Sequence, residues 1–255
     1  MVHGTLNILG SVSRPGAGPP LLRRQMSMRP GAGVATLPCV SDSAIPLRIK
    51  FCGLTDPADV QVCVDAGAWA IGAIMTPHGP RALDGRAAEA VMAAVPHGVE
   101  RVGVFVDPTP QGLADAVARC HLTRVQVHAP ADLSAIVAAS PVPVILALRL
   151  DGADAIVAAA AAECDLVLFD AAVPGHHGGT GVLADWGLLV ANRPSRPFAL
   201  AGGLTPEVVG DAVRLVRPDI IDVASGVESS PGRKDPILVA EFARAARHAA
   251  LGMAA

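Results

Sequence analysis

The chain has 255 residues and a formal net charge of -3, with 51% hydrophobic, 17% charged and 3% aromatic residues. This composition is typical of a folded domain with a large core and excludes general disorder. No apolar stretch is long enough to cross a membrane. An acidic balance with few aromatic rings argues against a nucleic-acid binder.

The cysteine and lysine content further limits the class of protein. The five cysteines are odd in number and lack CxxC spacing, which argues against a disulfide framework or a zinc site and favours the cytoplasm. Lys50 and Lys234 are the only lysines, and the other basic residues are arginines, an excess consistent with a GC-rich coding sequence.

Residues 1–45 differ from the rest of the chain. They contain no acidic residue before Asp42, and the tetrapeptide Pro-Gly-Ala-Gly occurs at Pro15 and again at Pro30. Such sequence predicts a disordered N-terminal extension, followed by one catalytic domain at 46–255. Two origins fit the extension: an organellar transit peptide, or a start codon placed too far upstream.

The remaining sequence alternates short β-rich runs with segments of helical spacing. Eight strands, each followed by a helix, predict a single (β/α)8 TIM barrel, with a doubly wound open sheet as the alternative. The predicted strands are 47–52, 68–75, 101–106, 124–128, 142–148, 165–170, 197–201 and 220–224.

Four predicted helices begin with a capping residue followed by proline. The Asp or Thr side chain satisfies free amides of the first turn, and proline there loses no hydrogen bond. These starts are Asp56-Pro57, Thr109-Pro110, Thr205-Pro206 and Asp235-Pro236.

The chemistry of such barrels gathers where the strands end. Cys52 closes the first strand, and Gly53 lets the chain turn sharply, so the thiol is expected in the barrel mouth. The alternative is a buried, inert cysteine, which fits Cys63, Cys120 and Cys164.

One further polar side chain follows the second strand, and two lie on the fourth. Arg81 is suited to hold a carboxylate through paired N–H donors, although a lone loop arginine is often only solvated. Gln126 and His128 share one face of the fourth strand by alternation, so both point inward or both outward.

Asp170 ends the sixth strand after an apolar run. Burial there should raise its pKa and suit it to donate a proton, while the alternative is a capping role for the following loop. That loop, 171–184, is long and rich in glycine, which is typical of a mobile lid. Its His176 and His177 have no further ligand at suitable spacing, so no metal is expected.

Glycine-containing dipeptides follow the last two strands. Gly202 and Gly203 come after the seventh strand, and Ser225 and Gly226 after the eighth. Each pair leads into a helix start, where barrels of this kind bind phosphate with backbone N–H groups. The sequence therefore predicts a phosphate site.

Motifs at 50–55, 101–106, 125–128, 178–181 with 185–186, 201–204 and 225–228 with 231–235 recur in a characteristic order and spacing. In these motifs, from about Arg48 to the C-terminal helix, the chain resembles the phosphoribosylanthranilate isomerase family. It departs from the family pattern at Phe51, Ala129, Ala184 and Ala224, which concerns substrate fit more than reaction type.

The resemblance implies an isomerase of tryptophan biosynthesis that acts on N-(5-phosphoribosyl)anthranilate by Amadori rearrangement, without a cofactor. We expect a monomer or homodimer with a small phosphorylated substrate and no nucleic-acid or membrane partner. By resemblance, Cys52 is the general base, Asp170 the general acid and Arg81 the clamp on the anthranilate carboxylate, while the glycine loops at Gly202-Gly203 and Ser225-Gly226 hold the phosphate. Gln126 and His128, the two polar side chains on one face of the fourth strand, are expected to bind the substrate as well.

Two other functions fit the same residues. One is a different phosphosugar isomerase of a specialised pathway, because one fold hosts many chemistries. The other is a non-catalytic phosphosugar-binding barrel, which would have no physical need for Cys52 and Asp170 together.

Overall fold

The structure is a computed structural model that describes residues 47–171 and 186–253. The predicted extension at 1–45 lies outside the described residues, and so does the predicted lid at 171–184 apart from Ala171. No helix within the described ranges is long and apolar enough to cross a membrane.

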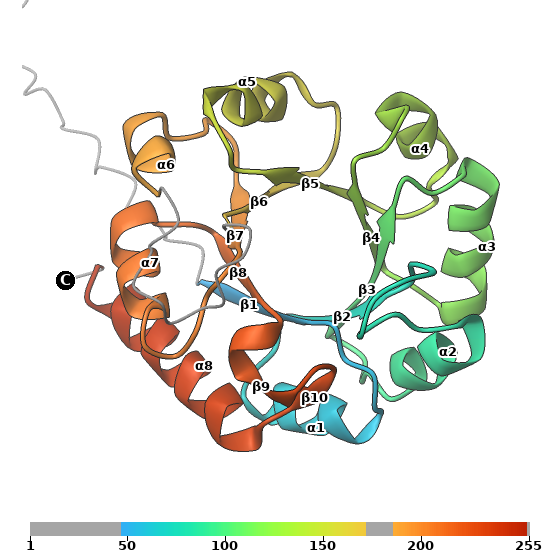
Figure 1. The fold of residues 1–255 in the computed structure, drawn as a ribbon, viewed down its shortest axis with the longest axis horizontal. Coiled ribbons are helices and arrows are strands. Elements are labelled where there is room, and N and C mark those ends of the chain that lie inside the picture. Colours follow the sequence, from blue (N-terminus) through green and yellow to red (C-terminus); the bar gives the residue numbers. More distant parts are fainter. Residues whose placement is uncertain (1–46, 172–185, 254–255) are drawn as a thin grey trace, which may run out of the picture. The chain divides into compact units, whose positions relative to one another are not determined.

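The eight longer strands of the described residues close into one barrel in chain order (Figure 1). All their pairings are parallel, and the barrel closes because the first strand pairs with both the second and the eighth. The predicted (β/α)8 barrel is confirmed, and the open-sheet alternative is wrong. The strands are β1 Arg48–Cys52, β2 Ala70–Ile74, β3 Glu100–Val106, β4 Arg124–His128, β5 Val144–Arg149, β6 Leu166–Asp170, β7 Phe198–Ala201 and β8 Ile220–Val223.

Helices surround the barrel, as Figure 1 shows. Two of the predicted starts are confirmed in full: Thr109 accepts a hydrogen bond from the Gly112 amide, and Asp235 accepts from the Ile237 and Leu238 amides. The helices are α1 Ala58–Asp65, α2 Gly85–Ala93, α3 Pro110–Cys120, α4 Leu133–Ala139, α5 Ala153–Ala161, α6 Gly187–Ala191, α7 Val209–Val216 and α8 Pro236–Leu251.

The predicted helix start at Thr205 is wrong, because α7 begins at Val209. The Thr205 hydroxyl does not cap the helix and donates to Glu207 Oε2 at 2.5 Å. Its carbonyl still accepts from the Val209 amide at 3.0 Å, so Thr205 closes a turn ahead of the helix.

Strand alternation divides the core into two layers. On β1 the side chains of Ile49 and Phe51 pack outward under the helices, where the Phe51 ring meets the Phe242 ring of α8 edge to face at 6.2 Å. Cys52 belongs to the second layer, which fills the barrel together with small and aliphatic side chains of the other strands. The layer inside the barrel positions the polar groups of the mouth.

A two-stranded antiparallel hairpin follows β8 and was not predicted. It consists of β9 Glu228–Ser230 and β10 Arg233–Lys234, preceded by a short 3-10 turn η1 at Ser225–Val227. The hairpin is held near β1, because the Thr55 hydroxyl donates to the Gly232 carbonyl at 2.8 Å and Asp59 accepts from the Lys234 amide at 2.9 Å. This contact places Lys234 beneath the end of β1.

Candidate active site

The thiol of Cys52 lies inside the barrel at the C-terminal end of β1. Cys52 is only 6% exposed and faces Gly72 of β2 in register. A Cβ atom at Gly72 would lie 2.8 Å from Cys52 Sγ, so glycine is needed there to make room for the thiol. The expected inward orientation of Cys52 is what the structure has.

A buried ion pair lies one residue pair deeper in the barrel. Lys50 Nζ is 2.9 Å from Asp222 Oδ2, with the two side chains 1% and 7% exposed. The same Cβ at Gly72 would lie 3.2 Å from Lys50 Nζ, so this ammonium and the Cys52 sulfur flank one small space. Burial alone would lower the pKa of Lys50, but the charges and hydrogen bonds of Asp222 and Cys52 outweigh it and the pKa is raised.

The surroundings of Cys52 act on its pKa in opposite directions. Burial is the largest cause and raises it; the ammonium of Lys50 lowers it, the carboxylate of Asp222 raises it, and Lys234 lowers it. The net direction is upward, so the ligand-free protein holds Cys52 mainly as a thiol at neutral pH.

This balance predicts the pH dependence of Cys52 alkylation. The thiolate is the reactive form, so iodoacetamide labelling of Cys52, located by peptide mass spectrometry, should rise with pH only above the ordinary thiol pKa of about 8.5. In the double variant Lys50→Met/Asp222→Asn, which removes the pair without leaving one buried charge alone, the rise should move to higher pH. A rise that begins near neutrality, or a double variant with an unchanged profile, would contradict this reading of the environment.

On the opposite side of the barrel, Gln126 and His128 both point inward from β4. The Gln126 amide donates to His128 Nε2 at 2.9 Å, which leaves the ring proton on Nδ1 when the ring is neutral. Burial is the main cause that lowers the pKa of His128, and the nearby carboxylate of Asp170 only partly offsets it. Within the described part of the chain, the buried Gln126 Oε1 has no hydrogen-bond partner.

Asp170 ends β6 with its side chain half-buried. It is in register with Arg149 of β5 and Ala201 of β7, and alternation from the barrel-filling Leu166 and Leu168 directs it inward. Its carboxylate is one of the groups that act on the pKa of His128. Strand geometry thus turns Cys52 and Asp170 toward the same mouth.

Arg81 lies between β2 and α2, beside Cys52. A Cβ atom at Gly53, whose φ is +74°, would lie 2.7 Å from Arg81 Cδ, so the arginine side chain crosses directly over this glycine. Its guanidinium is held by Glu228: Nε donates at 2.9 and 3.0 Å to the two carboxylate oxygens, and Nη2 donates at 2.5 Å. Arg81 is therefore an ordered part of the mouth and not a solvated loop residue.

The two glycine loops after β7 and β8 contact each other. Gly202 and Gly203 have φ of 92° and 66°, which favour glycine. A Cβ atom at Gly226 would lie 1.9 Å from the Leu204 carbonyl oxygen, so the turn at Ser225–Val227 rests directly on the neighbouring loop. The structure thus brings together the two loops that the sequence assigns to phosphate.

Gly226→Ala tests this close approach. Because backbone cannot give way as a flexible side chain can, we expect a cost of about 1–3 kcal/mol in the free energy of unfolding. Gly152→Ala is the control, since no atom lies within 4 Å of its Cβ position, and it should change stability by less than about 0.5 kcal/mol. Chemical denaturation of both variants measures the difference, and equal stabilities would show that the loops are not in contact.

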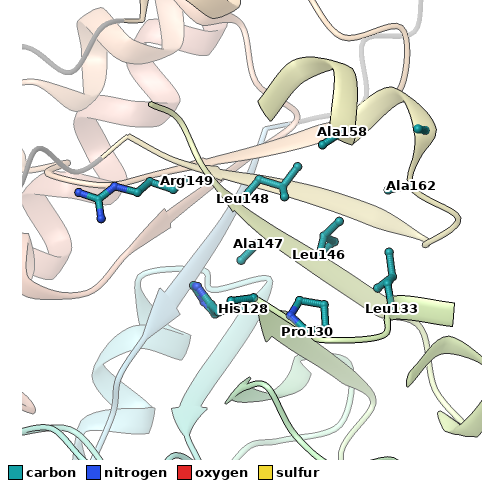
Figure 2. Close-up of a pocket in the computed structure, with 11 residues that line it drawn as sticks. His128, Pro130, Leu133, Leu146, Ala147, Leu148, Arg149, Ala158 and Ala162 are labelled. Carbon is teal, nitrogen blue, oxygen red and sulfur yellow. The ribbon is translucent and has the colours of Figure 1, made fainter. Parts of the chain in front are cut away.

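A separate crevice of about 570 Å³ lies between α4 and α5 outside β5 (Figure 2). Its walls are aliphatic and come mainly from outward side chains of β5 and from the two helices, while His128 and Arg149 mark its border toward the barrel mouth. It offers little chemistry of its own, and it adjoins the mouth at His128.

The sequence prediction missed four charged residues of this region. Lys50 and Asp222 form the buried pair, Glu228 binds Arg81, and Lys234 binds Glu228. The signal for the lysines was present, because the chain has only two lysines and both are buried here. Among the described residues, no group of three or more His, Cys, Asp and Glu side chains is arranged to hold a metal ion.

A closed (β/α)8 barrel whose mouth carries a thiol, a carboxyl, an imidazole and a guanidinium defines a TIM-barrel enzyme suited to acid–base chemistry. The family model described as N-(5'phosphoribosyl)anthranilate (PRA) isomerase matches residues 49–245. The chain belongs to the phosphoribosylanthranilate isomerase family.

Individual relatives agree with this membership. N-(5'-phosphoribosyl)anthranilate isomerase from Neisseria gonorrhoeae is 40% identical over 198 residues, which cover 77% of this chain and 94% of the relative. A phosphoribosyl anthranilate isomerase solved with reduced 1-(o-carboxyphenylamino)-1-deoxyribulose 5-phosphate has a TM-score of 0.70 and 30% identity, covering 79% of this chain and 99% of its own. Monomers generated from the dimeric Thermotoga maritima isomerase match with the same score, identity and coverage.

Proposed function

We propose that the chain converts N-(5-phosphoribosyl)anthranilate to 1-(2-carboxyphenylamino)-1-deoxyribulose 5-phosphate, an Amadori rearrangement of tryptophan biosynthesis. The family match over the whole barrel supports the reaction. One observation carries the residue assignment. Cys52 ends β1 and Asp170 ends β6, and both side chains face inward at the same rim of the barrel.

In this proposal Asp170 is the general acid and Cys52 the general base. Asp170 donates a proton to the furanose ring oxygen, the bond between C1 and that oxygen breaks, and the nitrogen lone pair forms an iminium. Cys52 then removes the proton from C2, and the electrons of that C–H bond neutralise the iminium to give an enolamine. The enolamine then becomes the ketone: the 2-hydroxyl loses its proton and C1 gains one, so the number of protons on the substrate is unchanged.

The raised pKa of Cys52 in the ligand-free protein supports an order of events. Burial disfavours the thiolate, so the base becomes competent when a positive charge forms next to it. The iminium supplies that charge, and it exists only after Asp170 has opened the ring. The thiol proton then passes to the carboxylate that Asp170 has become, and the resulting thiolate takes the C2 proton. The acid step therefore precedes and enables the base step.

The two ends of the substrate fit opposite charges of the mouth. Arg81 is assigned to the anthranilate carboxylate, and the loops at Gly202-Gly203 and Ser225-Gly226 to the phosphate, through backbone N–H groups. Gln126 and His128 are assigned to the sugar hydroxyls. A neutral imidazole there, as its lowered pKa favours, both donates and accepts.

The direct test is turnover by purified protein. With N-(5-phosphoribosyl)anthranilate as substrate, chromatography should show complete conversion to the aminoketose. Faster turnover of another phosphorylated aldose would favour a different phosphosugar isomerase. Binding of the substrate without turnover would favour a non-catalytic barrel.

We also propose that the protein works in the cytoplasm as a monomer or homodimer on this small substrate alone. The dimeric state named for the Thermotoga maritima relative makes the homodimer a specific expectation. Sedimentation equilibrium of the full chain distinguishes the two states.

A further inference from the structure

The two lysines of the chain are both buried at the end of β1, whereas arginine supplies every other long-chain cation. A surface arginine and a surface lysine exchange easily, but a compact ammonium with three donors in a tetrahedral arrangement has no arginine equivalent in a closed site. Lys50 pairs with Asp222 next to the thiol. Lys234 instead contacts Glu228, which binds Arg81.

Lys234 uses all three of its N–H donors. Its Nζ donates to the carbonyl of Cys52 at 2.8 Å, to the carbonyl of Ala224 at 3.0 Å and to Glu228 Oε1 at 2.8 Å, and its side chain is fully buried. The two carbonyls belong to the last residue of β1 and to the residue that follows β8. One ammonium thus ties the ends of two adjacent strands to Glu228.

Glu228 links Lys234 to Arg81. Its side chain is 3% exposed and accepts from Lys234 and from both Nε and Nη2 of Arg81. Burial alone would raise the pKa of Glu228, but the hydrogen bonds and charges of Arg81 and Lys234 outweigh it, so the pKa lies below its ordinary value. Glu228 therefore stays ionised and accepts charged hydrogen bonds from both Arg81 and Lys234.

The contact fixes which edge of Arg81 is available. Glu228 occupies the Nε–Nη2 edge, and among the residues that the structure describes no hydrogen-bond partner engages Nη1. Because the side chain crosses Gly53, which directly follows Cys52, the remaining Nη1–Nη2 edge is held at a set place relative to the thiol. A guanidinium can bind a carboxylate through two parallel N–H donors on one edge.

We propose that Glu228 and Lys234 are positioning residues, which hold Arg81 beside Cys52 so that its Nη1–Nη2 edge receives the substrate carboxylate. The inference rests on the proposed function and names how that site fixes the aromatic end of its substrate. The three side chains together carry one net positive charge, which the substrate carboxylate neutralises.

Glu228→Gln tests the proposal, because it keeps the shape of the side chain and removes the charge that holds Arg81. A lost hydrogen bond to a charged group predicts a rise in KM of about 10- to 100-fold, with kcat changed by less than about threefold. The matched control is Glu241→Gln, the same exchange at an exposed position of α8, which should leave both constants unchanged.

A double-mutant cycle separates positioning from a direct contact. In an Arg81→Met background, Glu228→Gln should change KM by less than about twofold, because its effect passes through Arg81. Full additivity of the two losses in KM, or a Glu228→Gln enzyme with wild-type KM, would overturn the proposal. Glu228→Asp keeps the charge on a shorter side chain, and we expect its KM to lie between those of the wild type and Glu228→Gln. This variant replaces Glu228→Gln in the test if the glutamine variant does not fold.

A crystal structure of Glu228→Gln, or of Glu228→Asp, keeps this inference separate from the proposed reaction. We expect the Arg81 guanidinium to leave its position over Gly53, whatever substrate the wild-type enzyme turns over. An unmoved guanidinium would overturn the positioning role. Failure of the wild type to convert N-(5-phosphoribosyl)anthranilate would instead refute the proposed function.

Discussion

Replacing Cys52 with alanine is expected to lower kcat by about 10²- to 10⁴-fold, the range that a positioned general base contributes. The iminium would still form in this variant, but no group at the end of β1 could then remove the C2 proton. Affinity for the reduced product analogue should stay close to that of the wild type, because the carboxylate and phosphate contacts are intact. Steady-state kinetics and titration calorimetry measure the two quantities.

Cys63→Ala is the matched control for this prediction. Cys63 is also buried, with burial raising its pKa to about 12, but it lies on α1 outside the barrel. Its replacement should leave kcat near the wild-type value. Normal turnover by Cys52→Ala would mean that another group takes the C2 proton and that the assignment of the thiol is wrong.

Asp170→Asn is expected to cause a loss of the same order, about 10²- to 10⁴-fold in kcat. The amide keeps the size of the side chain but has no acidic proton to give to the ring oxygen, so ring opening becomes limiting. A substrate already opened to the iminium level would bypass this step, whereas Cys52→Ala would remain blocked. This difference assigns the two residues to separate proton transfers.

Asp165→Asn serves as the control on the same strand region. Asp165 lies at the opposite end of β6, where it accepts a hydrogen bond from the Val144 amide at 2.8 Å. The exchange there should affect stability more than kcat. If both variants lose turnover equally, the effect of Asp170→Asn is structural and not a lost proton transfer.

The sequence predicted those features of the site that are set by the position of a residue along a single strand. Alternation along β4 predicts that Gln126 and His128 share one face, the position of Cys52 at the end of β1 predicts its place in the mouth, and the strand count predicts the closed barrel. The start of α7 at Val209 could not be predicted by the same local logic, because the Thr205 hydroxyl has a competing acceptor in Glu207.

The missed residues depend on partners that are distant along the chain. Lys50 and Asp222 are 172 positions apart, and Lys234 contacts the Cys52 carbonyl across 182 positions. Local propensity and periodicity carry no information on such pairs; barrel closure and the β9–β10 hairpin create them. A lysine inside an apolar strand was the one local sign that a buried counter-charge had to exist.

The most direct measurement of the central claim is a crystal structure of the protein with the reduced product analogue. The account predicts the carboxylate on the free edge of Arg81, the phosphate on the amides near Gly203 and Gly226, and the sugar carbons between Cys52 Sγ and Asp170. An analogue bound with Cys52 Sγ out of reach of C2, or with Asp170 out of reach of the 4-hydroxyl that corresponds to the ring oxygen of the substrate, would contradict it.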